Sequence, residues 1–117
     1  MKKILIVEDD PDTIEIVEAV LHMAGYAVIK INREITIKEI AGINPNLVIL
    51  DYLMPYTLGN ELCSAIKGNP KTKNIPVILY SASKLDKRVV TECKADEFVS
   101  KPFDLNHLLA VVDRLAN

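Results

Sequence analysis

Short hydrophobic runs alternate along the chain with longer stretches in which apolar residues recur at helical spacing. Short runs bounded by polar loops are typical of β-strands, and runs without polar residues are typical of strands buried on both faces. Three runs are hydrophobic throughout and predict central strands, whereas two mixed runs predict more exposed strands. The central strands are expected at 4–7, 47–50 and 77–80, and the exposed strands at 27–31 and 97–100.

A stretch with helical spacing follows each predicted strand. Ile14, Val17 and Leu21 mark the first helix, which Gly25 is expected to end. Five strands that alternate with five helices predict one doubly wound parallel sheet with helices on both faces, and no linker divides the chain. The other helices are predicted around 35–43, 60–68 and 86–94, and by Leu105, Leu108, Leu109 and Val112.

The composition agrees with one globular domain and argues against several functions. The chain has 117 residues, half of them hydrophobic, and this length suits a single core. Its net charge is -2 and its basic residues are scattered, which argues against a nucleic-acid interface. The N-terminal MKKILIVEDD is too acidic for a signal peptide, and no run approaches membrane-spanning length, so we expect a cytoplasmic protein without membrane contact.

The two cysteines do not predict a metal site. Cys63 and Cys93 lack a CxxC spacing, and the chain has only two histidines that could complete a zinc site. We therefore expect reduced, partly buried thiols in the core.

Polar side chains collect where the predicted strands end. The carboxyl ends of parallel strands form the edge of the sheet at which ligands of such folds bind. Several carboxylates close together need a cation among them, and carboxylate oxygens with carbonyls and waters suit Mg²⁺. With the cation bound, a phosphoryl group could approach a carboxylate nucleophile and be held by a hydroxyl and an amine. The residues at this edge are Glu8, Asp9 and Asp10 after the first strand, Asp51 after the third, Ser81 and Ala82 after the fourth, and Lys101 and Pro102 after the fifth.

Four motifs, IVEDDP, LVILDYLMP, ILYSAS and KPF, resemble in this order the receiver domain of bacterial two-component response regulators. The resemblance spans the whole chain and is specific through the joint order of the motifs. It implies a flavodoxin-like sheet with strand order 2-1-3-4-5 and makes residues 1–117 one receiver domain. It also implies a signalling module, rather than an enzyme with an external substrate, that takes a phosphoryl group from a histidine kinase or a histidine phosphotransferase. We expect a monomer or weak dimer with a downstream protein partner.

The same resemblance assigns the residues of the site. Asp51 is the expected phosphoacceptor, and Asp51 and Asp9 are the expected direct ligands of Mg²⁺ or Mn²⁺. Glu8 is expected to act on the metal through water, and the backbone carbonyl of Leu53 to be a further ligand. Lys101 is expected to contact the phosphoryl group.

The resemblance also assigns a switch and residues that set the lifetime of the phosphorylated state. Ser81 is the expected switch hydroxyl and Phe98 the aromatic residue that moves with it, changing the surface of the fourth helix, fifth strand and fifth helix. Positions two after the acceptor and two after the switch hydroxyl tune hydrolysis in the family. Here they hold Leu53 and Ser83, with Ala82 beside the latter. Because the apolar Leu53 cannot orient a water molecule, we expect slow self-hydrolysis.

Some of these residues also have structural interpretations. Asp10 before Pro11 suits a helix N-cap. Glu8 and Asp9, taken alone, would suit a solvated loop. Phe98 suits the hydrophobic core as well as a switch.

The chain departs from the family pattern mainly in its second half. The segment from Ser81 to Lys101 is slightly shorter than in most receivers, and Lys94 stands where a glycine is common, so we expect a short or mobile fourth helix. Val111 stands where receivers attached to winged-helix DNA-binding domains use an arginine between subunits, which argues against that type of dimer. The second helix lacks the common Gly-x-Glu-Ala-Leu pattern.

Three other functions fit parts of the pattern. A flavin mononucleotide electron carrier shares the fold, but its phosphate needs a hydroxyl- and amide-rich loop where this chain has EDD. A hydrolase of the haloacid dehalogenase type would need a second aspartate where Leu53 stands. A receiver-like interaction domain that works without phosphate stays open, as do the kinase, the output and the question of a larger parent protein.

Overall fold

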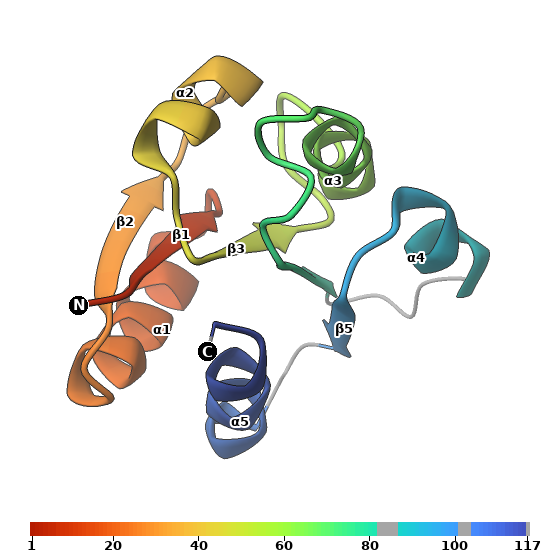
Figure 1. Ribbon diagram of the computed structural model, residues 1–117. Coiled ribbons are helices and arrows are strands. Elements are labelled where there is room, and N and C mark those ends of the chain that lie inside the picture. Colours follow the sequence, from red (N-terminus) through yellow and green to blue (C-terminus); the bar gives the residue numbers. More distant parts are fainter. Residues whose placement is uncertain (82–86, 101–103, 117) are drawn as a thin grey trace.

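The computed structural model describes residues 1–81, 87–100 and 104–116 and contains a five-stranded parallel sheet (Figure 1). The strands are β1 (Lys3–Val7), β2 (Ala27–Ile31), β3 (Leu47–Asp51), β4 (Val77–Ser81) and β5 (Glu97–Ser100). Their order is β2-β1-β3-β4-β5 with every neighbouring pair parallel, which confirms the predicted doubly wound sheet. The three hydrophobic runs form β1, β3 and β4, because a central strand between two helix layers buries all its side chains.

Helices cover both faces of the sheet. They are α1 (Pro11–Met23), α2 (Ile37–Ile43), α3 (Gly59–Lys67), α4 (Lys87–Cys93) and α5 (Leu105–Ala116). Figure 1 shows α1 and α5 on one face and the other three helices on the opposite face. Because strand side chains alternate between faces, Ile6 packs in the core under α1 and α5, and Leu5 packs in the other core. No helix in the described ranges has both the length and the apolar character needed to cross a bilayer.

The first helix begins and ends as its sequence predicts. Asp10 is the N-cap, and its side chain accepts a hydrogen bond from the Asp12 N–H at 3.4 Å. Pro11 occupies the first turn, where its missing N–H costs nothing. After the helix, Gly25 has φ 93°, a left-handed conformation that glycine adopts without steric cost. The structural interpretation of Asp10 is thus confirmed.

The second helix begins later than its apolar spacing predicts. It starts at Ile37 rather than 35, because Thr36 is its N-cap. The Thr36 hydroxyl accepts a hydrogen bond from the Glu39 N–H at 3.1 Å, and the Glu39 carboxylate accepts one from the Thr36 N–H at 3.2 Å. This reciprocal pair is a capping box, which satisfies two backbone donors at the start of the helix.

The fourth helix is short, as expected, with 7 residues. Directly after it, Lys94 has φ 62°, the left-handed conformation that favours glycine. The absence of a glycine here therefore leaves a strained backbone position at the end of α4.

The two cysteines are free and buried, as predicted. The Cys63 thiol on α3 donates a hydrogen bond to the Cys93 carbonyl oxygen on α4 at 3.2 Å. Burial raises the pKa of the Cys63 thiol. The thiols therefore act as small apolar groups that join two helices.

Candidate functional site

Three carboxylates meet at the carboxyl edge of β1 and β3. Glu8 and Asp9 directly follow β1, and Asp51 is the last residue of β3. The two strands are neighbours, with Val7 opposite Leu50, so the residues that follow them lie side by side. Carboxylate oxygens of Glu8, Asp9 and Asp51, called here the acidic cluster, lie within 4.8 Å of one another.

The members of the acidic cluster differ in exposure. Glu8 is 0% exposed and Asp51 is 7% exposed, whereas Asp9 is open to solvent. The Asp9 N–H donates a hydrogen bond to the Glu8 Oε2 at 3.1 Å. The interpretation of Glu8 as part of a solvated loop is therefore wrong, because its side chain is fully buried beside two other acids.

The acidic cluster suits a hard divalent cation. Two ionised carboxylates less than 5 Å apart repel each other by on the order of 3 kcal/mol at the effective dielectric of a protein surface. A bound cation reverses the sign of this interaction, and three carboxylate oxygens, of which that of Asp9 belongs to a solvent-exposed residue, are donors that Mg²⁺ accepts. The cluster could therefore bind Mg²⁺, and its chemistry fits that ion better than a softer metal.

Two tyrosines lie in the electric field of the acidic cluster. Tyr80 pairs with Asp51 in the β3–β4 register and is 1% exposed. Burial raises the pKa of Tyr80, and the charges of Glu8 and Asp51 raise it further. Burial raises the pKa of Tyr56 as well, followed by the charges of the acidic cluster. Both phenols therefore stay protonated. Each can donate a hydrogen bond to an anion beside it and so stabilise that anion.

Sequence reasoning missed both tyrosines. Tyr80 counted there only as one more hydrophobic residue of a central strand, and Tyr56 did not stand out at all. The available signal was a phenol directly before Ser81, since a buried hydroxyl needs a polar partner. The carboxylate of Glu8, whose charge acts on Tyr80, is a polar group of this kind.

The loop after Asp51, residues 52–58, folds back onto β3 and is called here the acceptor loop, after the role expected for Asp51. The Tyr52 N–H donates to the Tyr80 carbonyl oxygen at 2.8 Å, and the Gly59 N–H donates to the Tyr52 carbonyl oxygen at 2.7 Å. An isolated bridge joins Leu53 to Leu58. Leu53 is 55% exposed, so it lies at the surface two residues after Asp51.

Gly59 allows this close return of the chain. A Cβ atom at this position would lie 2.1 Å from the Asp51 carbonyl oxygen and 3.0 Å from the Leu79 Cδ1. No side chain fits at the first distance, so only glycine permits α3 to begin directly against β3.

The remaining predicted residues fall in two groups. Ser81 ends β4 at the same sheet edge and is 1% exposed. Phe98 lies opposite Leu79 in β5 and packs, half-buried, against the core on the α3 and α4 face, as its structural interpretation predicts. Ala82, Ser83, Lys101 and Pro102 lie outside the described residues.

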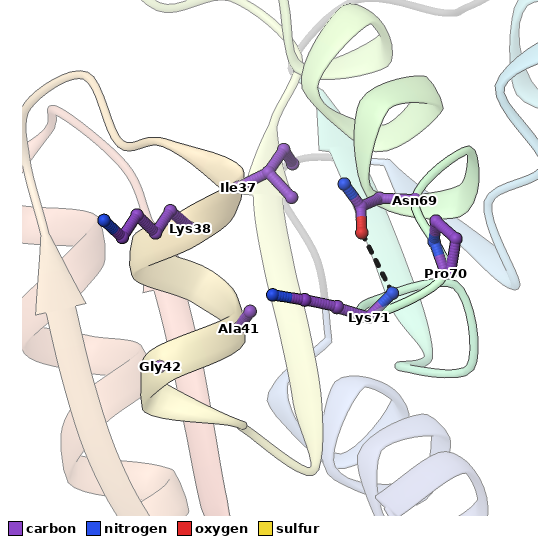
Figure 2. A pocket seen from close by; sticks show the side chains of 7 residues that line it. All are labelled: Ile37, Lys38, Ala41, Gly42, Asn69, Pro70 and Lys71. Carbon is purple, nitrogen blue, oxygen red and sulfur yellow. Dashed lines mark hydrogen bonds between the residues drawn. The ribbon is translucent and has the colours of Figure 1, made fainter.

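A groove of about 830 Å³ opens between α2 and the residues that follow α3 (Figure 2). Ile37 and Ala41 line it from α2, and Pro70 and Lys71 line it from the other side. Figure 2 shows Lys71 extending toward α2 across this groove. No member of the acidic cluster lines the groove, so it is separate from the candidate site.

Comparisons with known proteins agree with this geometry. A family model described as "Response regulator receiver domain" matches residues 4–113. The chain is 34% identical to the DNA-binding dual master transcriptional regulator RpaA of Synechocystis sp. over 98% of its own length and 49% of the regulator. It is 33% identical to the phosphate regulon transcriptional regulatory protein PhoB of Pseudomonas aeruginosa over 93% of its own length and 49% of that protein. The chain thus spans about half the length of these two relatives.

Solved structures give the same result. The receiver domain of a signal transduction histidine kinase from Syntrophus aciditrophicus is 36% identical and superposes with a TM-score of 0.84, covering 99% of this chain and 90% of that one. The response regulator TrrA from Thermotoga maritima, solved in complex with Mg(2+)-BeF, is 33% identical with a TM-score of 0.87, covering 98% of this chain and 99% of that one.

Proposed function

The chain belongs to the response regulator receiver family, and on this premise we propose that Asp51 accepts a phosphoryl group from a phosphohistidine of a histidine kinase or a histidine phosphotransferase. The observation that carries the proposal is the convergence of the acidic cluster at one sheet edge. Receiver domains are signalling domains of two-component systems rather than enzymes in the usual sense. The only reactions proposed for this chain are its own phosphorylation and its slow dephosphorylation.

The acidic cluster would hold Mg²⁺, or Mn²⁺, through Asp9 and Asp51, with Glu8 acting through water and the Leu53 carbonyl as a further ligand. When bound, the ion would neutralise part of the charge on the acids and on the incoming phosphoryl group. This assignment agrees with the exposures, because Asp9 is open to solvent whereas Glu8 is buried behind it.

Asp51 would act as the nucleophile. A carboxylate oxygen of Asp51 forms a bond to phosphorus while the bond from phosphorus to the histidine nitrogen breaks. The imidazole leaves with the electron pair of that bond and takes up a proton. Burial of Asp51 at the end of a hydrogen-bonded strand keeps the nucleophile in one position, which removes part of the entropic barrier.

Five further residues complete the proposed reaction site and switch. Lys101 and the Ser81 hydroxyl would bind the remaining phosphoryl oxygens, and Ser83 and Ala82 would help to set the rate of hydrolysis. Ser81 would draw β4 toward the phosphoryl group, and Phe98 would move with it. The surface of α4, β5 and α5 would then differ between the two states, which is what a downstream protein can recognise.

The test is chemical modification with a small donor. The protein is incubated with Mg²⁺ and acetyl phosphate, and intact mass is measured. We expect the wild type to gain the mass of one phosphoryl group. This gain should not occur in the absence of Mg²⁺ or in Asp51→Asn.

Asp10→Asn is the matched control, because asparagine is an equally good N-cap and Asp10 lies next to the acidic cluster without belonging to it. This variant is expected to be modified like the wild type. Wild-type protein that binds Mg²⁺ but gains no mass would favour the alternative function, an interaction domain that works without phosphate.

A further inference from the structure

The acceptor loop contains a buried hydroxyl with no partner among the described residues. The Tyr56 hydroxyl oxygen is shielded from solvent and makes no hydrogen bond within the described part of the chain. The ring of Tyr56 is half-buried and packs against the core on the α2, α3 and α4 face. The side chain is thus held in place by packing, while its only polar group is unsatisfied, and such groups in native proteins call for an explanation.

The surroundings of this hydroxyl are negative. Burial raises the pKa of Tyr56, and the charges of Asp9, then Glu8, then Asp51 raise it further. The phenol is therefore a hydrogen-bond donor at every physiological pH, and it bonds to none of the three acids whose charges act on it. A donor held in this way is complementary to an additional anionic oxygen placed between it and the acids.

The backbone explains why the hydroxyl stays in this place. The acceptor loop is closed at its base by the Leu53–Leu58 bridge and by the hydrogen bond from Gly59 to Tyr52. Its other anchor is the buried side chain of Met54. Tyr56 therefore cannot move away from the acidic cluster without breaking contacts that also hold the strand carrying Asp51.

We propose that the Tyr56 hydroxyl donates a hydrogen bond to a phosphoryl oxygen on Asp51 and is a further residue of the reaction site. The proposal rests on the proposed function, since it requires that Asp51 carries the phosphoryl group. A hydrogen bond to a charged acceptor changes an equilibrium constant by roughly 10-fold to 100-fold. Before phosphorylation the hydroxyl has no hydrogen bond within the described part of the chain, so its removal should not destabilise the unmodified protein. Its removal should destabilise only the phosphorylated state.

The test uses beryllofluoride with Mg²⁺ as a probe of phosphoryl binding at Asp51. Affinity is measured by calorimetry and ¹⁹F NMR on the full chain for wild type, Tyr56→Phe and Tyr26→Phe. We expect Tyr56→Phe to bind beryllofluoride at least about tenfold more weakly, to bind Mg²⁺ alone as the wild type does, and to keep or raise the thermal midpoint.

Tyr26→Phe is the matched control, because it also removes one hydroxyl. The Tyr26 hydroxyl donates to Asp113 on α5, away from the acidic cluster. This variant should show the opposite pattern, with a lower thermal midpoint and unchanged beryllofluoride affinity. In the wild type, the ¹³Cζ resonance of Tyr56 should shift when beryllofluoride binds, and this measurement does not depend on any variant folding.

Three results would overturn the proposal. The first is equal beryllofluoride affinity of Tyr56→Phe and wild type, and the second is an unmoved ¹³Cζ resonance. The third is an equal loss of affinity for Mg²⁺ alone, which would place the hydroxyl among the waters of the cation instead. If the wild type itself bound no beryllofluoride while binding Mg²⁺, the proposed function would fail, and this inference with it.

Discussion

Replacing Gly59 by alanine tests whether the close contact between α3 and β3 positions the candidate nucleophile Asp51. The added Cβ would lie 2.1 Å from the Asp51 carbonyl oxygen, whereas ordinary contacts of a Cβ begin near 3.4 Å. Either α3 or the end of β3 must therefore move by on the order of 1 Å, and overpacking of this kind costs about 1–3 kcal/mol. Because the obstacle is backbone rather than a flexible side chain, we expect about 3 kcal/mol.

The loss of stability should leave the variant folded at room temperature. A chain of this length has an unfolding free energy of about 6–17 kcal/mol, and each kcal/mol shifts the thermal midpoint by about 4 °C. We therefore expect the midpoint to fall by about 10 °C. Phosphorylation by acetyl phosphate should slow by up to about 100-fold, because a displacement of about 1 Å at a reacting group has an effect of this size.

Gly42→Ala is the matched control for this experiment. It makes the same chemical change within α2, where the new Cβ meets nothing within 4 Å. Alanine in a helix is favoured over glycine by about 0.5–1 kcal/mol, so this variant should be slightly stabilised and should be phosphorylated normally. A positioning role of Gly59 would be excluded if Gly59→Ala had the same thermal midpoint as Gly42→Ala, or if it lost stability without any change in the phosphorylation rate.

Four other outcomes are expected. Leu53→Asn should lose its acyl phosphate faster than wild type by intact mass, because the amide can orient a water, whereas Leu53→Ala should not; equal rates would contradict the tuning role. Lys94→Gly should raise the free energy of unfolding in urea by up to about 1 kcal/mol by relieving the left-handed backbone, and Lys94→Ala should not. Thr36→Ala should lower the free energy of unfolding by about 1 kcal/mol, whereas Thr36→Ser should not, because the side-chain hydroxyl caps the helix. Burial, which raises the pKa of Cys63, should keep Cys63 and Cys93 from alkylation in native protein at mildly alkaline pH, and urea should expose both; rapid native labelling would count against this packing.

The fold could be predicted from the sequence because the period of apolar residues changes between strands and helices. The start of α2 could not be predicted, because the helical spacing of apolar residues continues across the N-terminal boundary of this helix. Ile35 precedes the Thr36 cap and Ile40 follows in the first turn, and both are buried in the same core. These are the positions of a hydrophobic staple, in which a residue outside the helix keeps the spacing of one inside it. The capping box marks the true boundary.

The acids of the candidate site could be predicted for a different reason. In a parallel sheet every strand ends at the same edge, so a carboxylate directly after a buried run has a known place. The two tyrosines could not be found in this way. Their rings obey the hydrophobic pattern, and the position of a hydroxyl depends on how the acceptor loop folds, which no periodicity records.

This contrast separates what the sheet determines from what the acceptor loop determines. The β1–β3 register brings Glu8 and Asp51 together whatever residues form the loop, and the repulsion between them remains until a cation binds. Tyr56 belongs to the loop, and Gly59 follows it as the first residue of α3. Each breaks a local rule, Gly59 by a backbone approach that only glycine permits and Tyr56 by an unsatisfied hydroxyl. Departures from local rules that packing alone does not explain gather at functional sites. Differences in phosphorylation rate and lifetime should therefore follow the residues of the acceptor loop more closely than the acids, which any chain with this reaction needs.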